Sequence, residues 1–435
     1  MTHTSAIAPS VAAHTKRKRT GLFVVGTRPE AIKMLPVILA FQQAGHYDVR
    51  VISTGQHAEM TRRVLAIGGV EPDITFPPNP EPGNLNALFS HIVSELDAYV
   101  RAEFVAPEDQ NLPIACFVHG DTSSAAAAAL SSFHLRIPVV HVEAGLRTSN
   151  VLSPFPEELN RQLISRIAAL HLAPTMWNRN NLAREGVPGE RIFVTGNTSI
   201  DMLKIATGLD VEYSNDRLAV LGRGESTRPY IVVTAHRREN WGEPIERIAA
   251  SIATLAKQHP DVDFVVARHP NPIVAGPLTR HLDGIENVIL TAPLDYAEFA
   301  SILAHAAFAI SDSGGIQEEA PALGTPVLVL RESTEREEGV LAGTVTLVGT
   351  DPERIIAEAN YLLTDSAELE RRQNLVNPYG DGKAAERIVQ MADHIMYDDV
   401  DPAPFGSGVH RLSVLKVSGH DEDPAPRLKV EATAV

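Results

Sequence analysis

Short apolar runs alternate along the chain with longer stretches in which apolar residues recur at helical spacing. In the N-terminal half the apolar runs are GLFVVG, DVRVIST, IACFVHG, PVVHVEA and IAALHLAP, and the helical stretches are PEAIKMLPVILAFQQAG, NLNALFSHIVSELDAYVRAEF and TSSAAAAALSSFHL. Such runs are typical of strands buried on both faces, with helices as the crossovers of a parallel sheet. This half is therefore predicted to form a parallel α/β sheet.

The alternation starts again in the C-terminal half, where the apolar runs are PYIVVTAHR, VDFVVARH, NVILTAP, AFAISDSGG and TPVLVL. A chain of 435 residues is also too long for a single core. The two series predict an α/β fold of two Rossmann-like, doubly wound domains. Because such sheets bind ligands at the carboxyl ends of their strands, we expect the functional site in a cleft between the domains.

We place the domain junction at FVTGNTSID, residues 193–201. The first domain is predicted over residues 21–195 and the second over residues 196–384. Residues 1–20 are interpreted as a disordered extension. Residues 399–435, which contain the proline- and glycine-rich DPAPFGSG near their start, are interpreted as a flexible tail.

The formal net charge of −16 argues against a general binder of nucleic acid or of anionic membranes. The basic cluster Lys16–Arg19 allows a nucleic-acid contact or an address, but a solvated tail is the favoured interpretation. No apolar run reaches the length of a membrane span. The single cysteine, Cys116, cannot form an internal disulfide, which fits a cytoplasmic location. We expect no nucleic-acid partner and no membrane partner.

The turn after the first apolar run, GTRPEAIK, carries two cations at a helix start. Pro29 suits the first helical turn, and Gly26 permits a close backbone approach. Free N–H groups, the helix dipole and the charges of Arg28 and Lys33 together describe a phosphate site, although the Walker pattern is missing. The alternative is an ordinary strand–helix turn with surface cations.

The segment ISDSGGIQEEAP is predicted to end a strand and to begin a helix at Ser313, Gly314 and Gly315. Ser313 is expected to cap the helix, and the glycines are expected to clear space for a pyrophosphate over its amides. Glu318 and Glu319 follow in the first turn. A carboxylate there either accepts from ribose hydroxyls or complements the helix dipole.

Acidic residues follow the predicted strands of the first half. Asp121 lies in HGDT, Glu143 in HVEAGLRT, and Glu157 and Glu158 in SPFPEELNR. Singly, each acid suits a helix cap or an ion pair. Gathered in one cleft, such carboxylates can serve as general acid and base.

His236 lies at a predicted strand end beside Arg237 and Arg238 in TAHRREN, which favours contact with a phosphate. The histidines lack metal-ligand spacing, there is no H-E-x-x-H pattern, and there is no cysteine cluster. We therefore predict no catalytic metal.

Together these segments resemble the non-hydrolysing UDP-N-acetylglucosamine 2-epimerases. The matching stretches, in order, are GTRPEAIKM, TGQH, HGDT, HVEAGLRT, SPFPEELNR, VTGNTSID, HRREN, SDSGGIQEEAP and NPYGDG, and they span most of residues 21–390. The resemblance implies the glycosyltransferase-B architecture, in which two Rossmann-like domains face a deep cleft and a final helix, here 385–398, returns to the first domain. It also implies a homodimer and no cofactor.

The resemblance further implies reversible inversion at sugar carbon 2, which interconverts UDP-N-acetylglucosamine and UDP-N-acetylmannosamine and supplies precursors of cell-surface polysaccharide. The family eliminates UDP to give a 2-acetamidoglucal, then adds UDP back with a proton on the other face. This route needs acid–base carboxylates and stabilisation of departing UDP.

By motif match, Asp121, Glu143 and Glu157 resemble the acid–base carboxylates of the family. His236 matches the histidine near the leaving phosphate. The residues that match substrate contacts are Arg28 and Lys33 around the diphosphate and sugar, Ser313, Gly314, Gly315 and Glu319 at the diphosphate and ribose, and Phe299 near the uracil.

Some bacterial members bind a second UDP-N-acetylglucosamine as an activator. The residues that match this activator site are Gln56, Arg237 and His269. The chain departs from the family pattern nearby, with Ala58 in place of a basic residue, Pro270 in place of leucine and a segment ERE around Glu337 that lacks the usual proline. These departures leave the catalytic set intact but do not support activation or an unchanged fine specificity.

Three alternatives remain on the sequence. A glycosyltransferase of the same architecture would use the same nucleotide site but need an acceptor. A hydrolysing epimerase would release UDP and free N-acetylmannosamine, and a sugar-nucleotide sensor would bind without catalysis. The three carboxylates and GTRPEAIK favour the epimerase, and His236 argues against a silent sensor.

Overall fold

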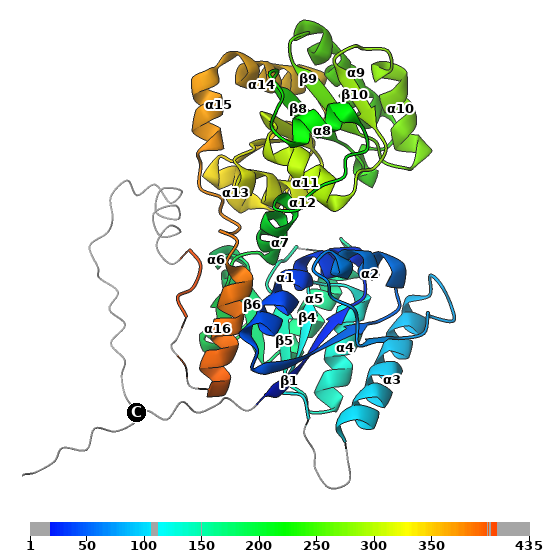
Figure 1. The fold of residues 1–435 in the computed structure, drawn as a ribbon, viewed down its shortest axis with the longest axis vertical. Coiled ribbons are helices and arrows are strands. Elements are labelled where there is room, and N and C mark those ends of the chain that lie inside the picture. The colour runs from blue at the N-terminus through cyan, green and yellow to red at the C-terminus, as the bar shows by residue number, and fades with distance from the viewer. Residues whose placement is uncertain (1–17, 106–111, 149, 398, 400–401, 407–435) are drawn as a thin grey trace, which may run out of the picture.

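The computed structural model describes residues 18–105, 112–148, 150–397, 399 and 402–406. Within them the chain forms two parallel sheets flanked by helices. Figure 1 shows the two α/β units one above the other, with α7 (Thr198–Thr207) between them. The prediction of two doubly wound domains is confirmed. Most of the predicted extension and tail lies outside the described residues.

The first sheet has the order β3-β2-β1-β4-β5-β6-β7, and all its pairings are parallel. Its strands are β1 (Arg19–Val25), β2 (Tyr47–Ser53), β3 (Ile74–Thr75), β4 (Ala115–His119), β5 (Val139–Val142), β6 (Leu170–Ala173) and β7 (Ile192–Val194). The strand order reverses between β1 and β4. The carboxyl ends of these strands therefore flank the switch point at which such sheets bind ligands.

The second sheet has the order β10-β9-β8-β11-β12-β13, again with parallel pairings. Its strands are β8 (Tyr230–Thr234), β9 (Asp263–Ala267), β10 (Val288–Thr291), β11 (Phe308–Ser311), β12 (Val327–Val329) and β13 (Val345–Leu347). Here the switch point lies between β8 and β11.

The helices of the first unit are α1 (Arg28–Ala44), α2 (Ala58–Ala66), α3 (Leu85–Phe104), α4 (Ser123–His134), α5 (Glu157–Ile167), α6 (Met176–Arg184) and α7. Those that follow are α8 (Asp216–Gly222), α9 (Glu243–Gln258), α10 (Pro272–Leu282), α11 (Tyr296–Ala304), α12 (Gly314–Glu319), α13 (Glu337–Ala342), α14 (Pro352–Thr364), α15 (Ser366–Gln373) and α16 (Ala384–Tyr397).

The sequence prediction lacks β3, β7 and β13, which have two or three residues and lie outside the apolar runs given above. It also starts the first domain too late. Arg19 and Thr20 belong to β1, where they pair with Tyr47 and Asp48 of β2. The interpretation of residues 1–20 as disordered is wrong for these two residues.

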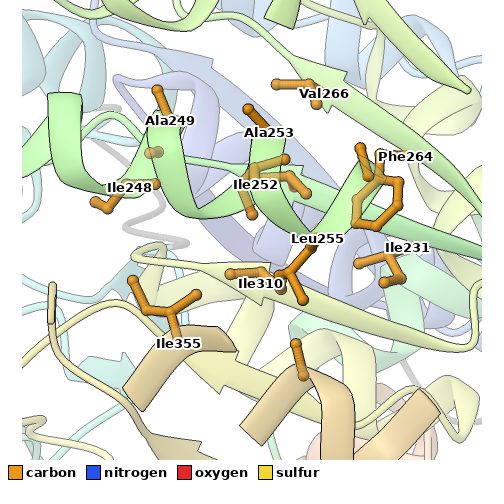
Figure 2. Packing of buried hydrophobic residues seen from close by; sticks show 14 of the residues in the cluster. Ile231, Ile248, Ala249, Ile252, Ala253, Leu255, Phe264, Val266, Ile310 and Ile355 are labelled. Atoms are coloured by element: carbon orange, nitrogen blue, oxygen red, sulfur yellow. The ribbon is translucent and has the colours of Figure 1, made fainter. Parts of the chain in front are cut away.

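Apolar helix faces close over both sheets. In the second domain, Ile252 and Leu255 of α9 are buried in one cluster with Phe264 of β9 and Ile310 of β11 (Figure 2). Burial of such side chains contributes about 1.5–3 kcal/mol each. The packed cores therefore stabilise the sheets and so hold the loops at the carboxyl ends of their strands in place.

The final helix returns to the first domain. Ala385, Ile388 and Met391 of α16 are buried in the same cluster as Phe23 and Met34, and α16 lies beside the first sheet in Figure 1. This arrangement matches the position that the resemblance implies for the final helix.

Part of the predicted flexible tail is packed against this domain. The Phe405 N–H donates to the Val194 carbonyl over 2.8 Å, and Arg387 of α16 lies over the Phe405 ring, 5.5 Å from its centroid. The prediction of a flexible tail from residue 399 is therefore wrong at Phe405, because a backbone hydrogen bond and a cation–π contact hold it.

Candidate active site

Glu30 closes the turn between β1 and α1. Its Oε2 accepts from the Gly26 N–H at 3.1 Å, from the Thr27 N–H at 2.7 Å and from the Thr27 hydroxyl at 2.8 Å. Its Oε1 accepts from the Thr122 hydroxyl at 2.7 Å. Burial outweighs these bonds and raises the pKa of Glu30 to about 7. The prediction of free N–H groups at this helix start is wrong for Gly26 and Thr27, because Glu30 occupies both amides.

Glu143 lies just beyond the end of β5, at the centre of the candidate site. Its backbone has a positive φ of 61°, which is rare outside glycine. Its Oε1 accepts from the Lys33 ammonium, and its Oε2 lies 3.3 Å from Nε2 of the buried His119. The carboxylate is thus hydrogen-bonded from α1, and the His119 ring at the end of β4 lies beside it without a hydrogen bond among the described residues.

Burial and mutual electrostatic interactions set the ionisation states of Glu143, Lys33 and His119. Burial alone would raise the pKa of Glu143, but Lys33 and His119 outweigh it and hold that pKa below its ordinary value. For Lys33, burial is outweighed by Glu143 and Glu318, and its pKa rises. Burial lowers the pKa of His119 to about 4. Near neutral pH the site therefore holds an ionised Glu143, a cationic Lys33 and a neutral His119.

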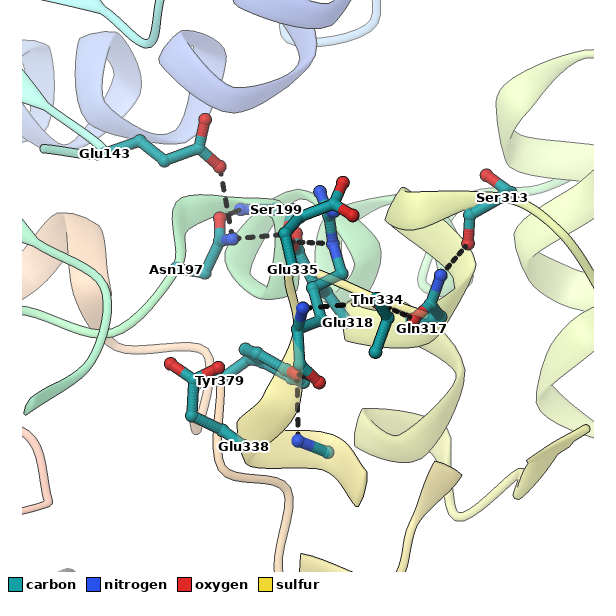
Figure 3. Close-up of polar contacts among 12 residues, drawn as sticks. Glu143, Asn197, Ser199, Ser313, Gln317, Glu318, Thr334, Glu335, Glu338 and Tyr379 are labelled. Atoms are coloured by element: carbon teal, nitrogen blue, oxygen red, sulfur yellow. Dashed lines mark hydrogen bonds and ion pairs between the residues drawn. The ribbon is translucent and has the colours of Figure 1, made fainter. Parts of the chain in front are cut away.

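Asn197 extends this group into the second domain. Its Nδ2 donates to Glu143 Oε1 at 3.2 Å and to Glu318 Oε2 at 2.9 Å (Figure 3). Glu318 lies in α12, and its other oxygen accepts from Arg336 Nε at 2.7 Å. A continuous polar chain therefore joins the carboxyl end of β5 to the second domain.

Asp121 and Glu157 are placed by α5. Asp121 Oδ2 accepts from Arg161 Nε at 2.8 Å, and its carbonyl accepts from Asn160 Nδ2 at 2.9 Å. Arg161 also pairs with the fully buried Glu158 at 2.7 Å. Glu157 begins the same helix, and its Oε2 is buried without a hydrogen-bond partner among the described residues. The predicted acids Asp121 and Glu157 therefore share one supporting helix.

Asp121 and Glu143 also lie close together. A Cβ on Gly120, the residue before Asp121, would be 3.5 Å from Glu143 Oε2. The charges of Glu143 and Asp121 both act to raise the pKa of His119, which lies two residues before Asp121. Asp121 and Glu143 are thus grouped at the carboxyl ends of β4 and β5, and Glu157 begins the helix whose Asn160 and Arg161 contact Asp121.

The start of α12 differs from the prediction in two respects. Ser313 precedes the helix but its side chain makes no capping hydrogen bond. Gly314 does not clear space for a ligand, because a Cβ there would be 2.8 Å from Cζ of Arg336. Gly315 is open, since its nearest neighbour would be 3.7 Å away. Burial, with a smaller contribution from Glu318, raises the pKa of Glu319 to about 8.

His236 is held at the carboxyl end of β8 by the buried Asp312. The His236 N–H donates to both Asp312 oxygens, at 3.1 and 2.9 Å, and the Arg237 N–H donates to Oδ2 at 2.9 Å. Burial lowers the pKa of His236, and Asp312 opposes this shift. The His236 ring stacks on that of His269 with centroids 6.0 Å apart. His236, Arg237 and His269 are therefore brought together.

The remaining predicted residues lie around this core. Arg28 is exposed at the first turn of α1, and Phe299 of α11 is half-buried against the second-domain core. Gln56 is distant in sequence from the other matches to the activator site, and its Oε1 accepts from Ser124 Oγ at 2.7 Å. Ser124 lies in the first turn of α4, and the N-cap of this helix, Thr122, donates its hydroxyl to Glu30.

Neither a metal-binding cluster nor a membrane-spanning helix is found in the described part of the chain. Its His, Cys, Asp and Glu side chains include no group of three or more arranged to hold a metal ion. None of its helices combines the length and apolar character needed to cross a membrane. Cys116 is buried, and burial raises the pKa of its thiol to about 12, so the thiolate that reacts as a nucleophile is disfavoured.

Comparison with known proteins identifies the family. The profile described as UDP-N-acetylglucosamine 2-epimerase matches residues 39–393. The UDP-N-acetylglucosamine 2-epimerase of Yersinia pestis is 44% identical over 375 residues, which cover 85% of this chain and 97% of that protein. The chain belongs to the UDP-N-acetylglucosamine 2-epimerase family.

Solved structures of this epimerase family share the fold. A UDP-GlcNAc 2-epimerase from Neisseria meningitidis bound to UDP-GlcNAc has 40% identity and a TM-score of 0.74, covering 86% of this chain and 99% of that one. The Methanocaldococcus jannaschii enzyme in complex with UDP-GlcNAc and UDP has 30% identity and a TM-score of 0.67, with coverage of 86% and 99%.

Several site residues of this epimerase-family chain are missing from the sequence prediction. His119, Asn197, Arg161 and Arg336 contact the predicted acids or Glu318 directly, and the first three lie within HGDT, VTGNTSID and SPFPEELNR. The partners of His119 and Asn197 come from distant parts of the chain, so their contacts had no local signal.

Proposed function

We propose that this chain catalyses the reversible epimerisation of UDP-N-acetylglucosamine to UDP-N-acetylmannosamine at sugar carbon 2, without hydrolysis. Family membership supports this activity. The observation that carries it is the ionised Glu143, held between Lys33, His119 and Asn197 beside two further acids. Such a cluster suits proton transfer at carbon better than transfer to an acceptor.

The proposed route is elimination followed by re-addition. A carboxylate removes the proton from carbon 2 while the bond between carbon 1 and the diphosphate oxygen breaks. A double bond forms between carbons 1 and 2, and UDP leaves with the electron pair. Addition of UDP to carbon 1 and return of a proton to the other face of carbon 2 complete the inversion. The net reaction consumes no cofactor.

The site residues are assigned roles by their charge. Glu143, Asp121 and Glu157 are the acid–base group, and Glu143 is ionised near neutral pH because Lys33 and His119 hold its pKa below the ordinary value. Arg28, Lys33 and His236 are assigned to the developing charge on UDP. Ser313 and Gly315 are assigned to the diphosphate, Glu319 to the ribose and Phe299 to the uracil. A protonated Glu319 can both donate to and accept from a hydroxyl.

The wider role follows from the product. UDP-N-acetylmannosamine is an activated sugar, and we assign it to the supply of cell-surface polysaccharide. A homodimer stays a prediction, and Gln56, Arg237 and His269 stay candidates for an activator site that the nearby departures from the family pattern do not support. A cytoplasmic location also stays a prediction.

Proton NMR of the purified chain with UDP-N-acetylglucosamine in deuterated water tests the reaction. We expect UDP-N-acetylmannosamine to appear, with deuterium at carbon 2 of both sugars, without acceptor or metal. Free N-acetylmannosamine with UDP would instead indicate a hydrolysing enzyme. A spectrum that stays unchanged even when the enzyme concentration is raised would overturn the proposal.

A further inference from the structure

Asn197 lies where the chain crosses between the domains in both directions. Its backbone N–H donates to the Tyr379 carbonyl over 2.7 Å, and Tyr379 lies on the segment that returns to the first domain. The crossings are closely packed, since a Cβ on Gly380 would be 3.3 Å from the Asn197 nitrogen. A change in the orientation of the two domains should therefore shift the backbone around Asn197.

The Asn197 side chain has one orientation that satisfies its neighbours. Its Oδ1 accepts from the Ser199 N–H at 3.0 Å and so caps α7. The amide nitrogen must then point the other way, toward Glu143 Oε1 at 3.2 Å and Glu318 Oε2 at 2.9 Å. Figure 3 shows this nitrogen between the two carboxylates. An amide NH₂ has two protons, so it can donate one to each.

The two carboxylates are anchored separately in different domains. Glu143 is bound by Lys33 of the first domain, and Glu318 by Arg336 of the second. The Asn197 amide is a neutral donor between two anions that would otherwise repel each other. It also joins the catalytic carboxylate of one domain to the nucleotide-side helix of the other.

We propose that Asn197 is a positioning residue that aligns Glu143 for proton transfer by bridging it to Glu318 across the domain junction. This inference rests on the proposed epimerase function, in which Glu143 exchanges the carbon-2 proton. It makes the geometry of the acid–base group depend on the arrangement of the two domains.

Two substitutions separate this role from helix capping. Both Asn197→Asp and Asn197→Ser keep a good N-cap, and aspartate keeps nearly the volume of asparagine. A structural role alone therefore predicts that Asn197→Asp is the milder change. The bridging role predicts the opposite order, because aspartate replaces the two donors with a third negative charge.

The expected result at pH 8 is a kcat lowered about tenfold in Asn197→Ser and about a hundredfold in Asn197→Asp, the range for losing a hydrogen bond to a charged group. The loss should fall on kcat more than on KM. Adding Glu318→Gln to Asn197→Asp removes one of the clashing charges and should recover at least about fivefold in kcat. If Asn197→Asp fails to fold alone, recovery of folded, active protein in the double variant is the same result.

The matched controls are Asn215→Asp and Asn215→Ser. Asn215 caps α8 by accepting from the Leu218 N–H and is exposed. The same chemical changes there should leave kcat unchanged. A kcat in Asn197→Asp equal to or above that in Asn197→Ser, or no recovery in the double variant, overturns the inference.

Urea unfolding of the same variants tests the bridge without substrate. We expect the midpoint urea concentration to be lower in Asn197→Asp than in Asn197→Ser. If the wild type is active but kcat is not lower in Asn197→Asp than in Asn197→Ser, the bridging role of Asn197 is rejected and the proposed function stands. A wild type that leaves UDP-N-acetylglucosamine unchanged defeats the proposed function and the role of Asn197 in catalysis. In that case the urea midpoints of Asn197→Asp and Asn197→Ser alone decide whether Asn197 bridges Glu143 and Glu318.

Discussion

At the scale of single residues, Glu143 is the most constrained side chain of the site. Its positive φ of 61° costs a non-glycine residue about 1–3 kcal/mol. Contacts with Lys33, His119 and Asn197 hold it there from three separate segments. The strain places the carboxylate beyond the end of β5, where both domains reach it.

Neutral replacement of the three acids tests their roles. We expect Glu143→Gln, Asp121→Asn and Glu157→Gln each to lower kcat at least about a hundredfold, because each removes a group that transfers or supports a proton. The measurement is the initial rate of epimerisation. Glu190→Gln, which changes an exposed acid outside the site, should keep the wild-type rate. Near-normal turnover in all three acid variants would contradict the assignment.

The pH dependence of stability tests the buried Glu30. Its pKa is about 7 in the folded protein and near 4.5 when unfolded, so the native state keeps a proton that the unfolded chain loses. The free energy of unfolding should therefore fall as pH rises from about 4.5 to about 7, by up to about 1.4 kcal/mol per pH unit. Glu30→Gln should lack this contribution.

Urea unfolding of both proteins at several pH values measures the effect, and the difference between them isolates Glu30 from other titrating groups. Parallel stability curves for Glu30→Gln and wild type would show that Glu30 titrates normally. Glutamine retains an oxygen for the Gly26 and Thr27 amides, so the turn itself should survive.

At the scale of elements, α16 depends on a residue far away in the sequence. Asp201 of α7 accepts from the Ala384 and Ala385 N–H groups, at 3.2 and 2.9 Å, and so holds the start of α16. The helix then buries Ile388 and Met391 in the first-domain core. The return of the chain to the first domain thus combines a polar cap with an apolar face.

Removal of this cap should weaken the protein more than removal of an ordinary one. Asp365 accepts one N–H, from Glu368, at the start of α15. We expect Asp365→Ala to lower the free energy of unfolding by about 1 kcal/mol and Asp201→Ala by about 2 kcal/mol or more, because two buried donors lose their acceptor. Urea denaturation of both variants measures the difference, and equal losses would contradict it.

At the scale of the whole molecule, the two domains are joined by buried polar contacts as well as by the crossings at Asn197 and Tyr379. The Thr175 hydroxyl at the start of α6 donates to Glu338 Oε1 at 2.6 Å. Both residues are buried, and burial raises the pKa of Glu338. This contact links the first domain to α13 beside Arg336, and hence to the Glu318 end of the bridge.

Loss of the Thr175–Glu338 contact should loosen the domain arrangement. We expect Glu338→Ala to increase the radius of gyration in small-angle scattering and to raise KM for UDP-N-acetylglucosamine more than it lowers kcat, since substrate must then hold the domains together. The neighbouring Glu337→Ala changes an exposed acid and should alter neither quantity. An unchanged radius and KM in Glu338→Ala would contradict this view.

The sequence by itself determined the architecture and the local chemistry of this epimerase-family chain. Short apolar runs that alternate with helical stretches favour parallel sheets, because strands covered by helices are buried on both faces. Glycine, proline and charged residues after the strands marked GTRPEAIK, HGDT and SDSGGIQEEAP as site segments. The short strands β3 and β13 were not predicted, since they lie outside the apolar runs that marked the other strands.

Only the tertiary structure decided how those segments combine. The amides at Gly26 and Thr27 are taken by Glu30, and the space beside Gly314 is taken by Arg336. Neither result is visible locally, because hydrogen-bond partners and steric neighbours are set by folding. The same reason explains Asn197: its sequence gives a helix cap, and only the fold places its amide between carboxylates of two domains.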